Sequence, residues 1–273
     1  MKRILLSIGS ILFAGAMLVG GTGAFGSQMQ TSTGNTFATG VIDLKIDNES
    51  YVTDDTGKLV FSPSTSWSLS NLAGKLFFNF LDLKPGDIGE DTISFHVNNN
   101  NAWACMSIKL TKTPENGITE PESFVDSTPG ENQGELQKVL KFVFWADDGD
   151  NVFERGEILF KYGYAKDIFN GTWWTLADSK FNIWNQKKNS PIPGSSVKYI
   201  GKAWCFGNMG QNPVPQDGKG KKEGSVNGPL VRGTGFTCDG ADLGNLYQSD
   251  GIKVDVSFLA MQSRDNTNFT CSK

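Results

Sequence analysis

The sequence is almost without histidine, since its 273 residues contain only His96. One imidazole cannot supply the paired ligands of a zinc protease, and no HExxH motif is present. The chain also has no Gly-x-Ser-x-Gly elbow to build a Ser–His–Asp triad around His96. The 29 acidic residues leave a glycosidase-like carboxylate pair open, but no spacing singles one out. We expect no catalytic residue and no enzyme.

An excess of positive charge is also missing, and the formal net charge is −4. Binding to a phosphate backbone needs clustered Lys and Arg, so we expect no nucleic-acid partner. Glycine is abundant, with 32 residues, which indicates many turns. The hydrophobic share of 38% is enough for a core and too high for a disordered chain.

Long apolar runs are missing except at the N-terminus, where Ile4–Val19 follows a short positive head. This run is shorter than the roughly 20 residues that a membrane-spanning helix needs. Thr22 and Ala24 supply the small residues that a signal peptidase reads. We expect residues 1–24 to be a signal peptide, cleaved between Ala24 and Phe25, and a product that is secreted or held at the cell surface. An uncleaved membrane anchor is the alternative.

Cysteine is scarce as well, and none of the four residues lies in a CxxC pair. Zinc ribbons and thioredoxin-like redox motifs therefore lack their usual spacing. In an exported protein four cysteines fit two disulfides, for which three connectivities are possible. We favour Cys205–Cys238, which would close a Gly-rich loop, and Cys105–Cys271, which would tie the last residues to an early strand. Free structural thiols are the alternative.

Apolar alternation with period two is frequent in the mature chain and predicts half-buried antiparallel strands. The apolar positions of the clearest segments are Ile42, Leu44 and Ile46; Leu76, Phe78 and Phe80; Ile93, Phe95 and Val97; Met106, Ile108 and Leu110; and Ile252, Val254, Val256, Phe258 and Ala260. Lys84–Asp87 has the Pro and Gly of a type II turn, which should join a strand over Leu76–Leu83 to one over Asp91–Asn98. We expect one domain over residues 37–273, an all-β antiparallel β-sandwich with little helix.

Two long segments, Thr111–Gln133 and Gly207–Thr237, interrupt the alternation and are rich in loop-forming residues. Between them, Gly134–Val143 has the apolar spacing of a short helix, although this run could equally enter a strand at Val139–Trp145. Loops of such length are unusual inside a compact domain and often carry function. We interpret both as surface insertions.

The sharpest local cluster comes directly after Trp145 and places five carboxylates and one asparagine around Gly149. Calcium takes six to eight oxygen ligands and tolerates irregular geometry. So many like charges on one turn repel one another unless a cation or Arg155 offsets them. The spacing is not that of an EF-hand, and a solvated acidic hairpin tip is the alternative. The candidate calcium ligands are Asp147, Asp148, Asp150 and Glu157, followed by Asn151 and Glu154.

Aromatic side chains gather in the second half of the chain. Exposed tryptophans on a secreted β-sandwich can stack on sugars, which makes an extracellular polysaccharide a candidate partner. Ordinary core packing is the alternative, since aromatic side chains bury about 150–250 Å² each. The aromatic residues concerned are Tyr162, Tyr164, Trp173, Trp174, Trp184, Tyr199 and Trp204.

Three stretches stand in a recognisable order and spacing. A signal ends in Gly-Gly-Thr-Gly-Ala-Phe at residues 20–25, Asn-Thr-Phe-Ala-Thr-Gly-Val-Ile-Asp-Leu occupies 35–44, and Phe-Phe-Asn-Phe-Leu-Asp-Leu-Lys-Pro-Gly-Asp occupies 77–87. Together they resemble the TasA/camelysin family of secreted proteins, whose signals are removed by a dedicated SipW-type peptidase. The resemblance covers roughly residues 1–112, and the second half departs from the best-known members.

The resemblance implies a jelly-roll β-sandwich that polymerises into an extracellular fibre or biofilm matrix. In fibre-forming members the segment freed by signal cleavage donates a strand to the next subunit, so that backbone hydrogen bonds join the copies. Here that segment would be residues 25–36, with Phe25 and Met29 as the subunit contact. A head-to-tail contact of this kind need not close, and it propagates as a homopolymer. The other hypothesis is a monomeric cell-surface adhesion module that binds calcium and glycan.

Overall fold

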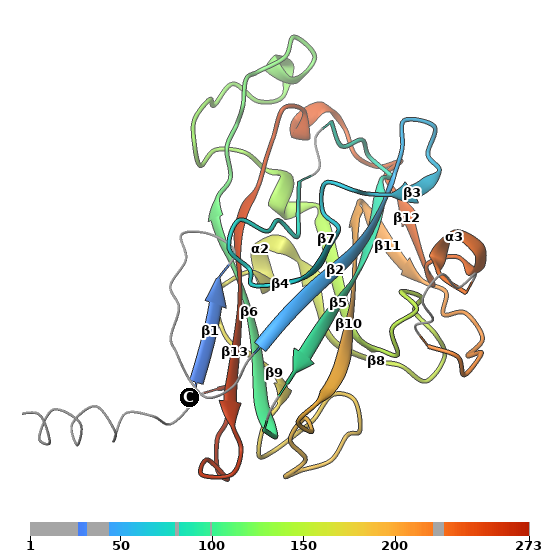
Figure 1. The fold of residues 1–273 in the computed structure, drawn as a ribbon. Helices are drawn as coiled ribbons and strands as arrows, with labels where there is room; N and C mark the ends of the chain where they lie inside the picture. The colour runs from blue at the N-terminus through green and yellow to red at the C-terminus, as the bar shows by residue number, and fades with distance from the viewer. Residues whose placement is uncertain (1–26, 32–43, 80–81, 99, 221–226, 273) are drawn as a thin grey trace, which may run out of the picture.

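The computed structural model describes residues 27–31, 44–79, 82–98, 100–220 and 227–272, and most of its regular structure is strand. Two antiparallel sheets pack against each other, which confirms the expected all-β sandwich (Figure 1). The expected signal peptide 1–24, its junction at Ala24 and Phe25, and the 32–36 part of the donor segment lie outside the described residues. No helix in the described ranges is long and apolar enough to cross a membrane.

The smaller sheet has four strands in the order β1-β13-β6-β9. Its bounds are Ser27–Thr31 (β1), Ala102–Lys112 (β6), Trp174–Ala177 (β9) and Lys253–Gln262 (β13). The long central pair is β6 with β13, and the apolar positions that the sequence predicted, such as Met106 and Phe258, are buried between the sheets. The alternation in these two segments therefore identified both the strand and its inner face.

The larger sheet has seven strands, six of them in the order β3-β2-β5-β10-β7-β8, with β4 paired to β2. Its bounds are Leu44–Thr53 (β2), Leu59–Phe61 (β3), Trp67–Ser70 (β4), Ile88–Val97 (β5), Leu140–Asp147 (β7), Ile158–Tyr164 (β8) and Ser196–Phe206 (β10). A separate hairpin and the short helical turns complete the described elements: Asn208–Gln211 (β11), Phe236–Asp239 (β12), Ala165–Ile168 (α2), Pro229–Arg232 (α3), Glu122–Phe124 (η1), Leu136–Lys138 (η2) and Asn245–Tyr247 (η3).

Aromatic rings fill the space between the two sheets. Phe144 on β7 meets Trp174 on β9 edge to face, with ring centroids 5.1 Å apart. Phe95 on β5 and Phe258 on β13 also join the two sheets, with ring centroids 6.0 Å apart. Buried aromatic pairs add about 0.5–1.5 kcal/mol each beyond the area they remove from water. These contacts fix the two sheets relative to each other.

A second, smaller core lies on the outer face of the larger sheet. Trp145 on β7 packs there with Phe153 and Phe236, and the last two rings stack at 4.8 Å. A Cβ added to Gly201 on the neighbouring strand β10 would lie 1.9 Å from the Trp145 ring. Only glycine at position 201 therefore allows the Trp145 ring to lie flat on the sheet. Phe153 and Phe236 then cover this ring.

The described residues of the predicted strand Leu76–Leu83 form no strand, so that prediction is wrong. Phe77 is buried instead, with its ring 4.8 Å from that of Trp67, and its carbonyl accepts a hydrogen bond from Lys202 at 3.0 Å. Leu76, expected on a buried face, is 45% exposed. The following turn is confirmed, since Gly86 has φ 96° and its neighbour Asp87 donates its N–H to the Lys84 carbonyl.

Two further predictions can be compared with the structure. Within Gly134–Val143 the chain makes only the short turn η2 and then enters β7 at Leu140, so the strand alternative holds. The segment Gly207–Thr237 is not wholly a loop, because it contains β11, the start of β12 and α3. It leaves and returns beside β10, as an insertion on the outer face should.

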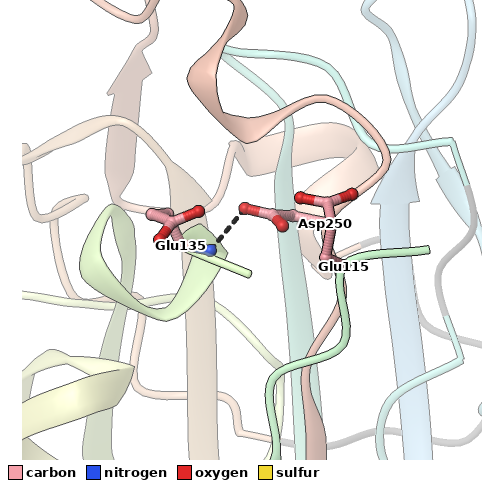
Figure 2. A group of neighbouring side chains, drawn as sticks. All are labelled: Glu115, Glu135 and Asp250. Atoms are coloured by element: carbon pink, nitrogen blue, oxygen red, sulfur yellow. Dashed lines mark hydrogen bonds between the residues drawn. The ribbon is translucent and has the colours of Figure 1, made fainter. Parts of the chain in front are cut away.

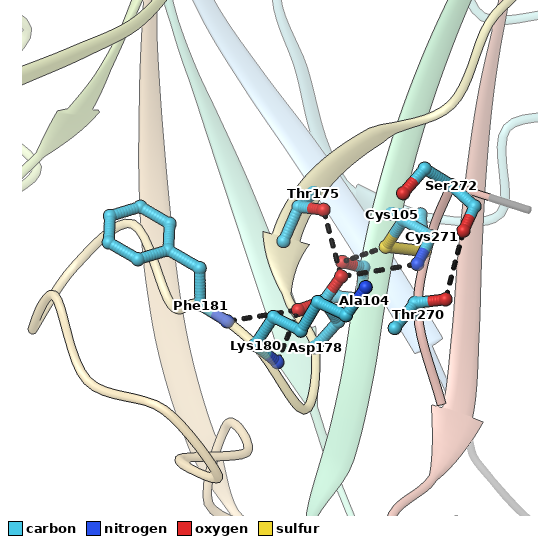
Figure 3. The surroundings of a disulfide bond; sticks show 9 residues. All are labelled: Ala104, Cys105, Thr175, Asp178, Lys180, Phe181, Thr270, Cys271 and Ser272. Atoms are coloured by element: carbon cyan, nitrogen blue, oxygen red, sulfur yellow. Dashed lines mark hydrogen bonds between the residues drawn. A yellow bond between two sulfur atoms is a disulfide. The ribbon is translucent and has the colours of Figure 1, made fainter. Parts of the chain in front are cut away.

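Both expected disulfides are present. Cys205–Cys238 joins β10 to β12 and closes the insertion at its base, with Cα atoms 5.5 Å apart. Cys105–Cys271 ties the C-terminal segment to β6 (Figure 3). Beside it, the Asp178 carboxylate accepts hydrogen bonds from the backbone N–H of Cys271 and the hydroxyl of Thr175. No cysteine is free among the described residues.

The described part of the expected donor segment is β1, which lies at the edge of the smaller sheet (Figure 1). It pairs antiparallel with β13 of its own chain, from Ser27 opposite Met261 to Thr31 opposite Ser257, with Met29 opposite Leu259. In this conformation the edge of β13 is occupied by the chain itself. A donated strand from another copy would have to displace β1.

Candidate metal centre

The acidic cluster predicted from the sequence forms the connection between β7 and β8. Strand β7 ends at Asp147, and three residues that take positive φ then shape the loop: Gly149 (108°), Asn151 (64°) and Gly156 (100°). Glycine and asparagine adopt this conformation at low cost. These turns fold the loop back on itself, so that carboxylates separated in the sequence meet.

Two overlapping sets of carboxylates result. Asp147, Asp148 and Glu157 form one set, and Asp148, Asp150 and Glu154 form the other. In each set one oxygen from every member lies within 4.8 Å of the others. Two ligands of one calcium ion stand at most about 5 Å apart, because each bond is about 2.3–2.6 Å long. The three carboxylates of each set are therefore close enough to bind one ion, and Asp148 belongs to both sets.

Several polar atoms of this loop are buried without a hydrogen-bond partner in the described structure. They are Asp148 Oδ1, Glu154 Oε2, and both side-chain atoms of Asn151. Glu154 is fully buried and Asn151 is 2% exposed. Leaving a buried polar atom unpaired costs about 1–3 kcal/mol, and more for a charged group. The three oxygens among these atoms could serve as cation ligands, whereas the Asn151 amide nitrogen, a donor, could not.

The other carboxylate oxygens have structural partners. Asp147 accepts hydrogen bonds from the Thr92 hydroxyl and from the indole N–H of Trp145. Both oxygens of Glu157 accept backbone N–H groups, from Asp148 at 3.1 Å and from Glu154 at 2.8 Å. Glu157 thus closes the loop as well as lining the site.

Two further charged residues contribute that the sequence analysis did not find. Glu90, on β5, is fully buried, and neither of its carboxylate oxygens has a hydrogen-bond partner among the described residues. Arg232, on α3, pairs with Asp150 at 2.7 Å and with Glu154 at 2.5 Å. Arg155, named above as the alternative to a cation, is exposed. The compensating guanidinium comes from the insertion, not from the acidic loop.

Burial and mutual repulsion hold these carboxyl groups away from their ordinary titration range. Burial, with the charges of Asp150 and Asp148, raises the pKa of Asp147 to about 8. Burial and the neighbouring Asp148 and Glu154 raise the pKa of Asp150 to about 7, against the opposing effect of Arg232. The pKa of Glu157 rises to about 9 and that of Glu90 rises well above its usual value, for the same two reasons.

The remaining sequence candidates do not assemble into a site. Trp174 and Trp204 are buried in the core, and Trp184 donates its indole N–H to the Tyr199 carbonyl. Packing therefore accounts for Trp174 and Trp204, whereas Tyr162 is 65% exposed, and sugar stacking stays a prediction. His96 lies 3.2 Å from Asp47 on the neighbouring strand β2, with no serine or cysteine nucleophile among its described partners.

Neither the family models nor the curated proteins compared with this chain give a match. The function has to be argued from the geometry of the site.

Proposed function

We propose that this protein is a non-enzymatic, extracellular β-sandwich module that binds Ca²⁺ in the β7–β8 loop. The observation that carries the proposal is the set of buried, unpartnered oxygens on Asp148, Glu154 and Glu90 beside other carboxylates. Six acidic side chains meet there, while the ion pairs of the described residues supply one guanidinium, that of Arg232. A divalent cation would bind one of the two carboxylate sets and offset the excess charge, which includes that of the neighbouring Glu90.

The donor set favours Ca²⁺ over other metals. It consists of carboxylates and one asparagine amide, without a histidine or a thiolate, and hard oxygen donors suit Ca²⁺ and Mg²⁺. The site is also irregular, because two of its oxygen sets share Asp148. Calcium accepts irregular coordination, whereas Mg²⁺ demands a near-ideal octahedron.

The cation would also hold the insertion on the sheet. Arg232 links the acidic loop to α3, and the backbone N–H of Asp217 donates to Glu154 from the same insertion. On α3 the neighbouring Leu230 and Val231 are exposed, by 56% and 68%. Calcium would thus order a surface that displays apolar side chains, which suits an adhesion module better than a catalytic one. The two disulfides agree with an oxidising, extracellular location.

Calcium titration of the full mature chain tests the proposal. Isothermal titration calorimetry should detect binding, and millimolar calcium should raise the melting temperature by mass action on the folded state. The variant Asp148→Asn removes one charge from both carboxylate sets. Without calcium it should melt at the same temperature as the parent or higher, because repulsion is relieved, yet it should lose most of the calcium-induced increase.

The matched control is Asp265→Asn, an exposed acid for which no contact is described. It should keep the full response to calcium. An equal response in Asp148→Asn and Asp265→Asn, or no response in the parent, would remove the proposal.

A second candidate function, a subunit of an extracellular fibre or biofilm matrix, rests on the sequence resemblance, and it would require β13 to release its own β1. This five-residue strand is the N-terminal described element and sits at a sheet edge, where it is held by β13. The same pairing made between copies would be a strand exchange, in line with the TasA/camelysin resemblance. Negative-stain microscopy of the mature chain with and without residues 25–36 tests it. Filaments that disappear on truncation support exchange, whereas monomers in both samples exclude it.

A further inference from the structure

A second acidic cluster lies where three segments of the chain meet (Figure 2). Glu115 follows β6, Glu135 precedes η2, and Asp250 lies between η3 and β13. Backbone pairing brings Glu115 opposite Asp250, and the backbone N–H of Glu135 donates to Asp250 Oδ2 at 2.5 Å. Carboxylates far apart in the sequence are thereby held together by the backbone.

The three carboxylates share two properties that a cation site requires. One oxygen of each lies within 4.8 Å of the others, which is within the span of two calcium–oxygen bonds. Each also has an oxygen that is buried and accepts no hydrogen bond from the described residues: Glu115 Oε2, Glu135 Oε2 and Asp250 Oδ1. Glu115 as a whole is only 7% exposed. These oxygens have lost water, and no N–H or hydroxyl group of the described residues donates to them.

The charges around the cluster do not balance it. Lys138 reaches Glu135 at 3.2 Å, but its side chain is 53% exposed, so this pair is weak. Burial, a side-chain hydrogen bond with Glu115 and the charges of Glu115 and Glu135 raise the pKa of Asp250 to about 7, against the lowering effect of the Glu135 N–H. A fourth acid, Glu122, is buried nearby and raises the excess further.

The chain is closely packed at this point. A Cβ added to Gly134 would lie 2.5 Å from Asp250 Oδ1 and 2.8 Å from the Pro114 carbonyl oxygen. Only glycine therefore lets Asp250 approach the backbone here and lie beside Glu135.

We propose that Glu115, Glu135 and Asp250 form a second Ca²⁺ site, which is independent of the β7–β8 loop. The site joins the 113–135 segment to the 248–251 segment. Both segments line the rim of a cavity of about 1100 Å³ whose walls include Phe142, Trp204 and Phe206. Calcium at this position fixes the rim, and its removal loosens the two segments together.

Calorimetry with CaCl₂ on the mature chain should find two classes of binding sites. Asp250→Asn should remove one of them and Asp148→Asn the other. Glu115→Gln is the second variant at the rim, in case Asp250→Asn impairs folding, and should lose the same class. Glu120→Gln is the matched control, an exposed acid in the same segment, and should keep both classes.

Hydrogen exchange followed by mass spectrometry locates the effect. Calcium should slow exchange in peptides covering 113–135 and 245–251 of the parent and of Asp148→Asn, but not of Asp250→Asn or Glu115→Gln. Calcium could instead leave exchange in these peptides unchanged, and both rim variants could bind as many calcium equivalents as the parent. That result would show that the carboxyl groups share a proton and hold no ion. Because Asp148→Asn leaves the rim intact, failure of one site is distinguishable from failure of the other.

Discussion

Glu90 and Asp91 are neighbours on β5, both are fully buried, and they face opposite sides of the larger sheet. On the inner side Asp91 has a complete set of partners: Lys202 at 2.6 Å, the Asn48 amide and the Ser50 hydroxyl. On the outer side Glu90 has none among the described residues and faces further carboxylates. A buried charge is tolerated when paired and is costly when it is not. The inner region is complete as protein alone, whereas the outer region has an unpaired buried carboxyl group that our proposal balances with a cation.

The charges confirm the contrast. Burial raises the pKa of Asp91 and lowers that of Lys202, and the attraction between the two groups opposes both changes. For Glu90 the neighbouring charges act in the same direction as burial and raise the pKa further. Substitutions at the two positions should therefore differ in sign, and calcium should affect only the outer one.

The largest effect is expected from breaking the inner pair. Lys202→Met removes the ammonium from Asp91, from the Phe77 carbonyl and from the face of the Phe78 ring, which it approaches to 3.7 Å. Stranding one member of a buried pair costs about 3–5 kcal/mol. Urea denaturation should show this loss equally with calcium and with chelator.

The double variant Lys202→Met/Asp91→Asn serves as the control, because it removes both charges. It should regain part of the lost stability. The loss of unfolding free energy in the double variant could instead equal the sum of the losses in Lys202→Met and Asp91→Asn. The two charges would then not interact, and the inner region would not be stabilised by this pair.

The inner region also shows what a sequence can and cannot predict. Alternation in Ile93, Phe95 and Val97 predicted the strand and its inner face, because strand side chains point alternately to either side. The same rule failed at Leu76–Leu83, where Phe77 covers the end of the core and gives its carbonyl to Lys202. That hydrogen bond joins residues 125 positions apart, and no local pattern records it.

At the outer site, too, the sequence revealed some of the residues and not others. The ligands between Asp147 and Glu157 lie in one short loop, so composition alone revealed them. Glu90 and Arg232 come from β5 and α3, and their contribution depends on strand order and on the path of the insertion. The only sequence signal at Glu90 is the pair of consecutive acids near the start of an alternating strand. At Arg232 no signal separates it from Arg155, since spacing does not reveal which arginine is near in space.

A pH series should give the next effect in size. The pKa values of Asp147, Asp150 and Glu157, at about 8, 7 and 9, lie above those of the unfolded chain, so the folded chain holds protons that the unfolded chain has released. With chelator present, stability should therefore fall as pH rises from about 4 towards 9. One excess proton over two pH units corresponds to about 2–3 kcal/mol.

Melting temperatures between pH 6 and 8 measure this slope. Calcium requires the deprotonated carboxylates, so its affinity should rise with pH and the calcium-bound protein should lose less stability. A slope that is the same with calcium and with chelator would place the titrating groups outside the site.

The smallest expected effect comes from a direct comparison of Glu90 with Asp91. Glu90→Gln keeps the shape of the side chain and removes the cost of protonating, or of burying as an anion, a carboxyl group without a partner, so in chelator at pH 8 it should stabilise by about 1–2 kcal/mol. Asp91→Asn makes the same chemical change one residue later and should destabilise, because Lys202 loses its counter-charge. Calcium should reduce or reverse the gain in Glu90→Gln and leave the Asp91→Asn difference unchanged. Equal signs in chelator would mean that Glu90 has a partner after all, and the need for a cation on the outer face would disappear.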